Sequence, residues 1–290
     1  MANLLDIRRR IKSVKNTEQV TKAMKMVSAS KLRRAQERVV NARPFADKMR
    51  EMLSHLASQT AEDFHHPLLD ARGDQRYRVF LITSDKGLCG GFNANLIKAA
   101  QVFIKQHADK EIELVTIGRK GRDFFRRQRE LAGEFIGLTG KGSVEFVEAV
   151  HLARERLIQR FTEDEGLDKV FVIFSEFKSV MTQRVVVEQL LPIAQETGDG
   201  EAAGPARDYI FEQPPAEIFG RLLPRMVEMQ IYRALLESIA SEQGARMTAM
   251  DAATKNAGDL ISTLTLNMNR IRQAAITREI IEIVSGAAAL

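Results

Sequence analysis

The sequence predicts an α/β fold with long helices: an antiparallel coiled coil of N- and C-terminal helices with an inserted Rossmann-like, mostly parallel α/β domain. Three observations predict it. Each end of the chain has a long apolar repeat in steps of three and four residues, and the middle alternates β-forming runs with helical patterns. Such alternation is typical of a parallel sheet covered by helices on both faces. The 290 residues are enough for both parts.

The N-terminal repeat predicts one helix over 3–57. Glycine is absent before Gly73, and Pro44 is the only proline in this stretch. Apolar or small residues recur every three or four positions, as in a coiled-coil seam. At 1.5 Å per residue the helix would reach about 80 Å, so part of it must leave any small globular body.

The C-terminal repeat predicts a second helix over 215–285, with weak points at Pro224, Gly244 and Gly258. Two long helices at opposite ends of a chain most simply pair with each other, and a domain between them makes the pair antiparallel. The predicted division is a coiled-coil helix at 1–60, an α/β domain at 75–191, a linker or edge segment at 192–214 and a coiled-coil helix at 215–290.

The middle of the chain predicts four strands, over 79–84, 112–117, 170–177 and 183–191. Helical patterns lie at 95–107, 121–129 and 143–162. The link between the last two strands is too short for a parallel crossover, so the last strand is predicted antiparallel to its predecessor. The segment that follows is rich in Gly, Pro and acids, which indicates a flexible connection in which "YIFEQPP" is a candidate edge strand.

The distribution of charge indicates an acidic partner, and the cysteine content excludes some kinds of site. Residues 1–60 carry 14 Lys and Arg against 5 Asp and Glu, a net of +9; because the whole chain is +5, the remainder is −4. The basic N-terminal segment is therefore expected to meet something acidic. Cys89 is the only cysteine, which excludes an intrachain disulfide and a cysteine zinc cluster.

Two glycine-rich stretches resemble nucleotide sites only in outline. Dinucleotide binding requires G-x-G-x-x-G, whereas Gly87, Gly90 and Gly91 give G-x-x-G-G. In "FIGLTGKGS" the spacing of a P-loop fails, because Phe135 stands where its first glycine belongs and Ser143 arrives one residue late. We interpret the first stretch as a tight turn of the sheet and the second as a false match.

The sequence offers no spacing for a carboxylate pair, a metal cluster or a catalytic triad. Cys89 lies near a predicted helix N-terminus, which can lower a thiol pKa, but no histidine has an evident reason to be nearby. A small buried thiol or a passive surface residue is the favoured interpretation. We therefore predict no catalytic, cofactor-binding or metal-binding residue and no bound cofactor, and keep a nucleotide-dependent α/β enzyme as an alternative.

Two stretches of the sequence indicate that the chain binds a macromolecular partner. The Lys and Arg of "MKMVSASKLRRAQERV" suit phosphates or an acidic protein surface. A nucleic-acid-binding coiled coil is thus a second alternative, but with no Trp and three Tyr the chain has few stacking platforms. The C-terminal "TREIIEIVSGAAAL" forms an apolar helix tip, although chain ends are usually polar. Such a tip predicts a surrounding sleeve; simple packing on the partner helix is the alternative.

Three segments together resemble the γ subunit of bacterial-type rotary ATP synthases: "IRRRIKSVKNTEQVTKAMKMVSASKLRRAQ", "SDKGLCGGFNANL" and "NRIRQAAITREIIEIVSGAAAL". The resemblance covers the whole chain in order. It implies a non-catalytic central rotor shaft whose terminal helices lie inside a hexamer of α and β subunits. It also implies that the α/β domain is a foot that binds ε and rests on the ring of c subunits, and that ion-driven rotation of this ring drives ATP synthesis or hydrolysis at β.

The resemblance also implies contact residues and excludes nucleic acid or a small-molecule substrate as direct partners. The residues assigned to contact with the α/β hexamer are Met24, Lys25, Lys86, Arg272, Gln273, Thr277, Glu279, Ile280, Val284 and Leu290. Those assigned to the c ring and ε are Tyr209 and Glu212. Chloroplast members carry a regulatory cysteine pair, which Cys89 alone cannot form. With no visible transit leader, the expectation is a peripheral protein on the cytoplasmic face of a bacterial plasma membrane.

Overall fold

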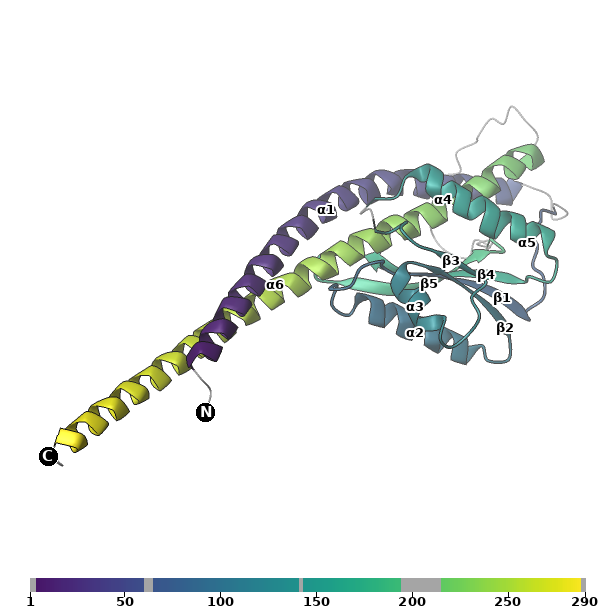
Figure 1. Cartoon of the computed structure of the whole chain (residues 1–290). Coiled ribbons are helices and arrows are strands. Elements are labelled where there is room, and N and C mark those ends of the chain that lie inside the picture. Colours follow the sequence, from purple (N-terminus) through teal and green to yellow (C-terminus); the bar gives the residue numbers. More distant parts are fainter. Residues whose placement is uncertain (1–3, 60–64, 141–142, 194–214, 288–290) are drawn as a thin grey trace. The chain divides into compact units, whose positions relative to one another are not determined.

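The structure, a computed structural model, describes residues 4–59, 65–140, 143–193 and 215–287 (Figure 1). Contacts within the chain group it into two units: a helical unit of residues 1–29 and 246–290, and an α/β unit of residues 30–245. Both boundaries fall inside the long helices α1 (Leu4–Gln59) and α6 (Pro215–Ala287). The four-segment division made from the sequence, with boundaries near the helix ends, stays a prediction.

In the helical unit, α1 and α6 run antiparallel. Lys25 forms an ion pair with Asp251, and the Thr254 hydroxyl donates to the Thr21 hydroxyl at 2.8 Å. Positions along α1 therefore fall as positions along α6 rise. This pairing confirms the predicted antiparallel coiled coil. The predicted helix ends lie within two residues of those observed, and α6 continues through Pro224, Gly244 and Gly258.

The α/β unit contains one five-stranded sheet in the order β3-β2-β1-β4-β5. Its strands are β1 (Arg76–Ile82), β2 (Glu111–Ile117), β3 (Gly133–Phe135), β4 (Lys169–Phe177) and β5 (Gln183–Leu191). The first four are parallel and β5 is antiparallel to β4. This confirms the mostly parallel Rossmann-like sheet; the short edge strand β3 was not predicted.

Helices cover both faces of this sheet. On one face lie α2 (Phe92–Gln106) and α3 (Arg119–Phe125); on the other lie α4 (Phe146–Ala153), the π-helix η1 (Arg154–Ile158) and α5 (Gln159–Glu163) (Figure 1). Side chains alternate along a strand, so β1 sends Val79 and Leu81 into the core beneath α2.

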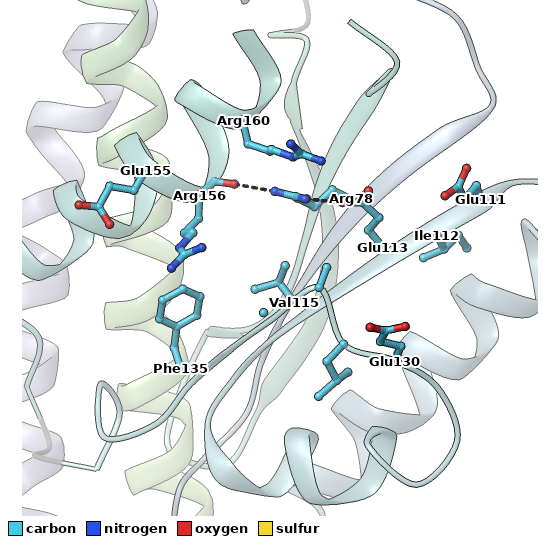
Figure 2. Close-up of a pocket in the computed structure, with 13 residues that line it drawn as sticks. Arg78, Glu111, Ile112, Glu113, Val115, Glu130, Phe135, Glu155, Arg156 and Arg160 are labelled. Carbon is cyan, nitrogen blue, oxygen red and sulfur yellow. Dashed lines mark hydrogen bonds and ion pairs between the residues drawn. The ribbon is translucent and has the colours of Figure 1, made fainter. Parts of the chain in front are cut away.

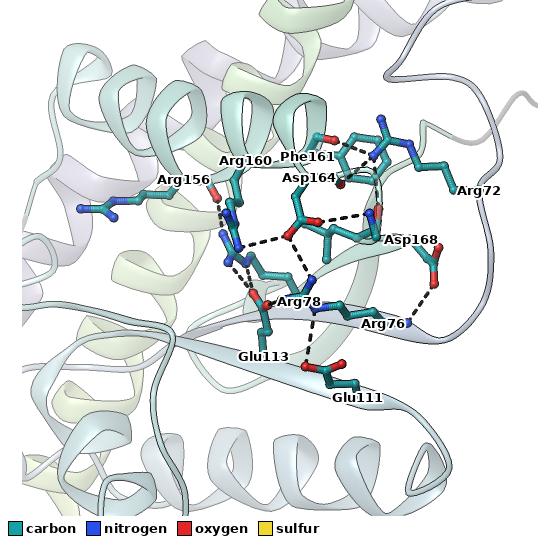
Figure 3. A network of polar contacts seen from close by, with 12 residues as sticks. Arg72, Arg76, Arg78, Glu111, Glu113, Arg156, Arg160, Phe161, Asp164 and Asp168 are labelled. Atoms are coloured by element: carbon teal, nitrogen blue, oxygen red, sulfur yellow. Dashed lines mark hydrogen bonds and ion pairs between the residues drawn. The ribbon is translucent and has the colours of Figure 1, made fainter.

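A polar network fastens the loop between α5 and β4 to the start of β1 (Figure 3). The Asp168 carboxylate accepts the amide N–H of Arg76 at 2.9 Å, and Arg76 forms an ion pair with Asp164 at 3.1 Å. Arg72 donates to the carbonyl oxygens of Phe161 at 2.6 Å and Asp164 at 3.0 Å. The amino-terminal edge of the sheet is thus held by directional contacts as well as by apolar packing.

Tyr77, at this edge, makes the stability of the chain depend on pH. Its hydroxyl donates to Asp74 at 2.5 Å, and burial together with this bond raises the pKa of Tyr77 to about 12 from 10.0. A raised pKa contributes stability that is complete below the unfolded value and is lost as pH rises through the folded one. Between these two pKa values, the free energy of unfolding should fall with pH less steeply in Tyr77→Phe than in the parent, by up to about 1.4 kcal/mol per pH unit. Urea unfolding at several pH values in this range would measure the difference. An equal dependence on pH in both proteins would contradict it.

Candidate functional site

The loop 84–91, between β1 and α2, is held rigidly by side chains. Asn93 accepts the amide N–H of Ser84 at 3.0 Å and donates to the Cys89 sulfur at 3.1 Å. The Ser84 hydroxyl donates to the carbonyl oxygen of Lys86 at 2.6 Å. Cys89 is buried, whereas Lys86 is exposed. The loop therefore presents its tip residues in one fixed geometry.

Leu88, at the tip of this loop, combines backbone strain with exposure. Its φ of 61° is the only positive value at a non-glycine among the described residues. The left-handed region is costly for side chains other than Gly, Asn and Asp. The Leu88 side chain is nevertheless 63% exposed, so burial does not offset that cost. Backbone strain that places an apolar side chain in solvent suggests that this side chain contacts another protein.

Asp85 occupies the place where a nucleotide fold would bind phosphate. Its buried carboxylate accepts the amide N–H groups of Arg119 and Gly137, each at 3.0 Å, and the Thr139 hydroxyl at 3.3 Å. Backbone donors beyond the carboxyl ends of parallel strands commonly bind phosphate. Here they are bonded to the chain's own carboxylate. A Cβ at Gly140 would lie 2.8 Å from that carboxylate, so the glycine of "TGKGS" leaves room for Asp85.

Asp85→Ala is therefore expected to destabilise the chain by about 3 kcal/mol, because several buried donors lose a charged acceptor. Asp85→Asn should cost less, since its amide oxygen still accepts one of the N–H groups. Urea unfolding of the two variants beside the unchanged chain measures both costs. If Asp85→Ala were as stable as the parent, the carboxylate would not be holding these loops together.

The C-terminal end of α6 is apolar and exposed. In the helical unit α6 continues past the start of α1 (Figure 1). Ile280 is 55% and Val284 62% exposed, and Ile276, Ile281 and Ile283 are exposed as well. Polar groups beside them bond along the helix itself: Thr277 donates to the carbonyl oxygen of Gln273 at 3.0 Å. This end is a smooth apolar helix rather than a site with converging polar groups.

A pocket of about 580 Å³ opens beside β2 and β3, under η1 and α5 (Figure 2). Arg78 on its floor donates to Glu113 at 2.8 Å and to the carbonyl oxygen of Arg156 at 3.2 Å. The guanidinium of Arg156 lies 5.6 Å from the centre of the Phe135 ring. Arg78 and Glu113 are already paired with each other, and the Arg156 guanidinium lies over the Phe135 ring, so these side chains give no chemical reason to assign a ligand.

Comparison with known proteins gives matches over the full length of the chain. The family model described as "ATP synthase" matches residues 3–290. The "ATP synthase gamma chain" of Solibacter usitatus is 52% identical, over 100% of this chain and 99% of its own, and that of Geobacter sp. strain M21 is 50% identical, over 99% and 98%. The chain belongs to the ATP synthase γ-chain family.

Solved structures agree with this assignment of the γ chain. A chain of the central stalk and c ring of Tetrahymena thermophila mitochondrial ATP synthase is similar, with 29% identity and a TM-score of 0.59, covering 81% of this chain and 99% of that one. A chain of the Euglena gracilis mitochondrial enzyme shares the fold, with 17% identity and a TM-score of 0.67, covering 99% of this chain and 94% of that one. In the described part of the γ chain, no helix combines the length and apolar character needed to span a bilayer.

The structure places the predicted contact residues of the γ chain in three regions. Met24 and Lys25 are half-buried on α1, and Lys86 is exposed on the rigid loop. The exposed residues on the last turns of α6 are Arg272, Gln273, Thr277, Glu279, Ile280 and Val284. Leu290, Tyr209, Glu212 and nearly all of the 192–214 segment lie outside the described residues. The partner roles of all these residues stay predictions.

Sequence reasoning missed Leu88 and Asp85. A positive φ cannot be recognised at a leucine from composition, because the signal for that conformation is glycine or asparagine. Asp85 had a usable signal, since it is a lone acid three residues after the end of a buried strand of a parallel sheet. Its acceptor role depends on loops that are distant in sequence, at 118–119 and 137–139, which no local pattern brings together.

Proposed function

We propose that this γ chain is the non-catalytic central-stalk subunit of a membrane-bound rotary ATP synthase. It couples ion-driven rotation of the c ring to ATP synthesis or hydrolysis at the β subunits. Its partners are the hexamer of α and β subunits, the ε subunit and the c ring. It acts as a peripheral protein at the cytoplasmic face of a bacterial plasma membrane.

One structural observation supports this function most directly. The last turns of α6 present exposed Ile and Val side chains beyond the start of α1, at a helix end that would otherwise fray in water. A smooth apolar rod is suited to turning inside an apolar sleeve, because apolar contact has no preferred direction. The name of the Tetrahymena structure, "central stalk/cring", supports the same role.

The proposed contacts with the hexamer are those that the family resemblance implies. Met24 and Lys25 would meet β along the coiled coil, and Arg272, Gln273, Thr277 and Glu279 would form its polar contacts nearer the tip. Ile280, Val284 and Leu290 would turn in the apolar bearing. Lys86, beside exposed Leu88, would meet an acidic surface of β. Tyr209 and Glu212 would face the c ring and ε.

Reconstitution tests the proposal. Adding the full chain to purified α and β subunits should give a stable complex with a single copy of it, measured by native mass spectrometry. The alternatives predict other outcomes: tight binding of ATP or NAD to the isolated chain in calorimetry for an enzyme, and affinity for nucleic acid that falls steeply with salt for a nucleic-acid-binding coiled coil. Failure to assemble would contradict the proposal.

Leu88 offers a sharper test of the loop contact. Leu88→Gly should stabilise the isolated chain by about 1 kcal/mol, because glycine adopts the left-handed conformation without strain. Leu88→Ala is the matched control, since it also removes the apolar side chain but keeps the strain. Both variants should weaken ATP-driven rotation of the assembled complex, while urea unfolding should show a gain only for glycine. If both variants rotated normally, Leu88 would not take part in the proposed contact between this loop and β.

A further inference from the structure

The part of α6 that lies in the α/β unit buries an unusual set of polar side chains. Between positions 225 and 244, the buried polar residues are Glu228, Glu237, Ser238, Ser241, Glu242 and Gln243. A helix that only needed to cover a sheet would bury apolar groups, because each buried polar group must be given a partner. The partners of Glu228, Glu237, Ser238 and Ser241 come from several elements of the unit.

The first attachment is to the end of β4. The Ser238 hydroxyl accepts the amide N–H of Ser175 at 3.2 Å, and the Ser241 hydroxyl donates to the carbonyl oxygen of Ser175 at 2.9 Å. The Glu237 carboxylate accepts the amide N–H of Phe177 at 3.1 Å. β4 pairs with β1 only as far as Ile173. Side chains of α6 thus take the place that a longer β1 would have filled.

This attachment lies at the carboxyl ends of β1 and β4, where the strand order reverses. In open α/β sheets that crevice is the usual place for a nucleotide. Here α6 side chains bond the backbone groups of β4 at this place. In this chain the position is therefore occupied by the attachment of α6 to the sheet.

The second attachment reaches the other side of the unit. Glu228 is 0% exposed, and its carboxylate meets Arg154 at 2.5 Å and Arg225 at 2.9 Å. Arg154 begins the π-helix η1, and two residues later the carbonyl oxygen of Arg156 accepts a hydrogen bond from Arg78 of β1 at 3.2 Å. Through these two bonds the π turn links α6 to β1 at the centre of the sheet. Single π turns of this kind occur frequently at functional sites.

The third attachment is to the edge strand. One terminal nitrogen of Arg233, Nη2, donates to both carboxylate oxygens of Glu188 on β5, at 2.6 and 2.9 Å. Charge-assisted hydrogen bonds of this type are roughly twice as strong as those between neutral groups. We call the set Glu228, Arg233, Glu237, Ser238 and Ser241 the α6 joint. From its first to its last member it spans about 20 Å of helix.

We propose that the α6 joint fixes the rotational position of α6 against the α/β body, so that turning the body turns the helix instead of slipping around it. Apolar packing alone is non-directional, whereas hydrogen bonds to three different elements resist rotation about the helix axis. Buried polar groups are better attested as devices that set register than as sources of stability. The proposal rests on the rotor function proposed above and names the residues through which the body would drive the shaft.

Local opening in the assembled complex is the first measurement. Ser238→Ala removes the acceptor of the Ser175 N–H, and Glu237→Ala removes that of the Phe177 N–H. Hydrogen-exchange mass spectrometry should show these amides exchanging about five-fold faster for each bond lost. Glu237→Gln keeps an acceptor oxygen and should restore slow exchange. Arg221→Gln, at an exposed position of the same helix outside the joint, should leave exchange unchanged.

Coupling is the second measurement, because a merely structural role would not change it selectively. In vesicles holding the full complex, Glu237→Ala and Ser238→Ala should keep ATP hydrolysis but lose part of the ion pumping per ATP. Glu237→Gln and Arg221→Gln should pump as the parent does. If a joint variant fails to assemble, Arg233→Gln is the milder test, since this arginine is partly accessible to solvent.

The outcomes separate this proposal from the rotor function. A parent chain that does not assemble with α and β would contradict the function. A parent that assembles and pumps, beside joint variants that open locally yet pump equally well, would overturn the joint alone. Unchanged hydrogen exchange in Ser238→Ala and Glu237→Ala would also overturn it, because the bonds would then not hold α6.

Discussion

Replacing Gly118 by alanine is expected to destabilise the α/β unit by at least about 3 kcal/mol. Gly118 lies directly after β2 with a φ of 97°, and a Cβ there would be 2.1 Å from the carbonyl oxygen of Thr83. That neighbour is backbone at the end of β1, so it cannot turn aside as a side chain would. The amide of Gly118 also donates to the carbonyl oxygen of Phe135 at 2.8 Å, so any shift would disturb β3 as well.

Gly137→Ala provides a matched control. Its φ of 92° is nearly the same, but a Cβ would meet nothing within 4 Å. It should therefore lose only the conformational part, about 1–2 kcal/mol. Urea unfolding of both variants gives the two costs directly. Equal losses at the two positions would mean that backbone conformation, and not the contact with Thr83, decides the cost at Gly118.

The second large effect is expected at the buried pair beneath η1. Arg78 and Glu113 have side-chain exposures of 9% and 14% and are directly paired. Glu113→Ala would leave the Arg78 guanidinium buried beside one carbonyl oxygen, which should cost about 3–5 kcal/mol. The cause is the unpaired buried charge, because Arg76 retains Asp164 as a second partner.

The double variant Arg78→Met with Glu113→Leu tests that cause. Replacing both charges by apolar groups of similar volume should cost much less than Glu113→Ala, and it can be neutral. Arg78→Met alone and Glu113→Leu alone complete the double-mutant cycle, with the free energy of unfolding as the readout. If the double variant lost as much stability as the two single changes added together, the pair would not be the source of the effect.

The long helices and the strands of the mostly parallel sheet could be predicted from the sequence because both depend on local repeats. Periodicity in steps of three and four located α1 and α6 to within two residues at each end. The start of β1 was placed three residues late, since Arg76 and Arg78 look like solvent-facing residues until Glu111 and Glu113 on β2 neutralise them. β3 is only three residues long and shows no period at all.

The candidate sites were harder to predict than the fold for two physical reasons. The joint on α6 depends on backbone groups of β4 some sixty residues away, such as the Ser175 amide that bonds Ser238. A sequence marks a buried serine in a helix no differently from an exposed one. The contact residues on α6 from Arg272 onward came from the resemblance alone, because their partners belong to other chains.

The buried thiol of Cys89 makes the protein convenient for labelling chemistry. It is the only cysteine in the chain, is 2% exposed and accepts a hydrogen bond from Asn93. Thiol reagents attack accessible thiolates, so the native protein should stay nearly unreactive toward maleimides. A cysteine introduced on the exposed end of α6 would therefore carry a fluorophore at one known place without removal of the native residue. The rate at which the native thiol is labelled would in turn measure how often the loop 84–91, which buries Cys89, opens.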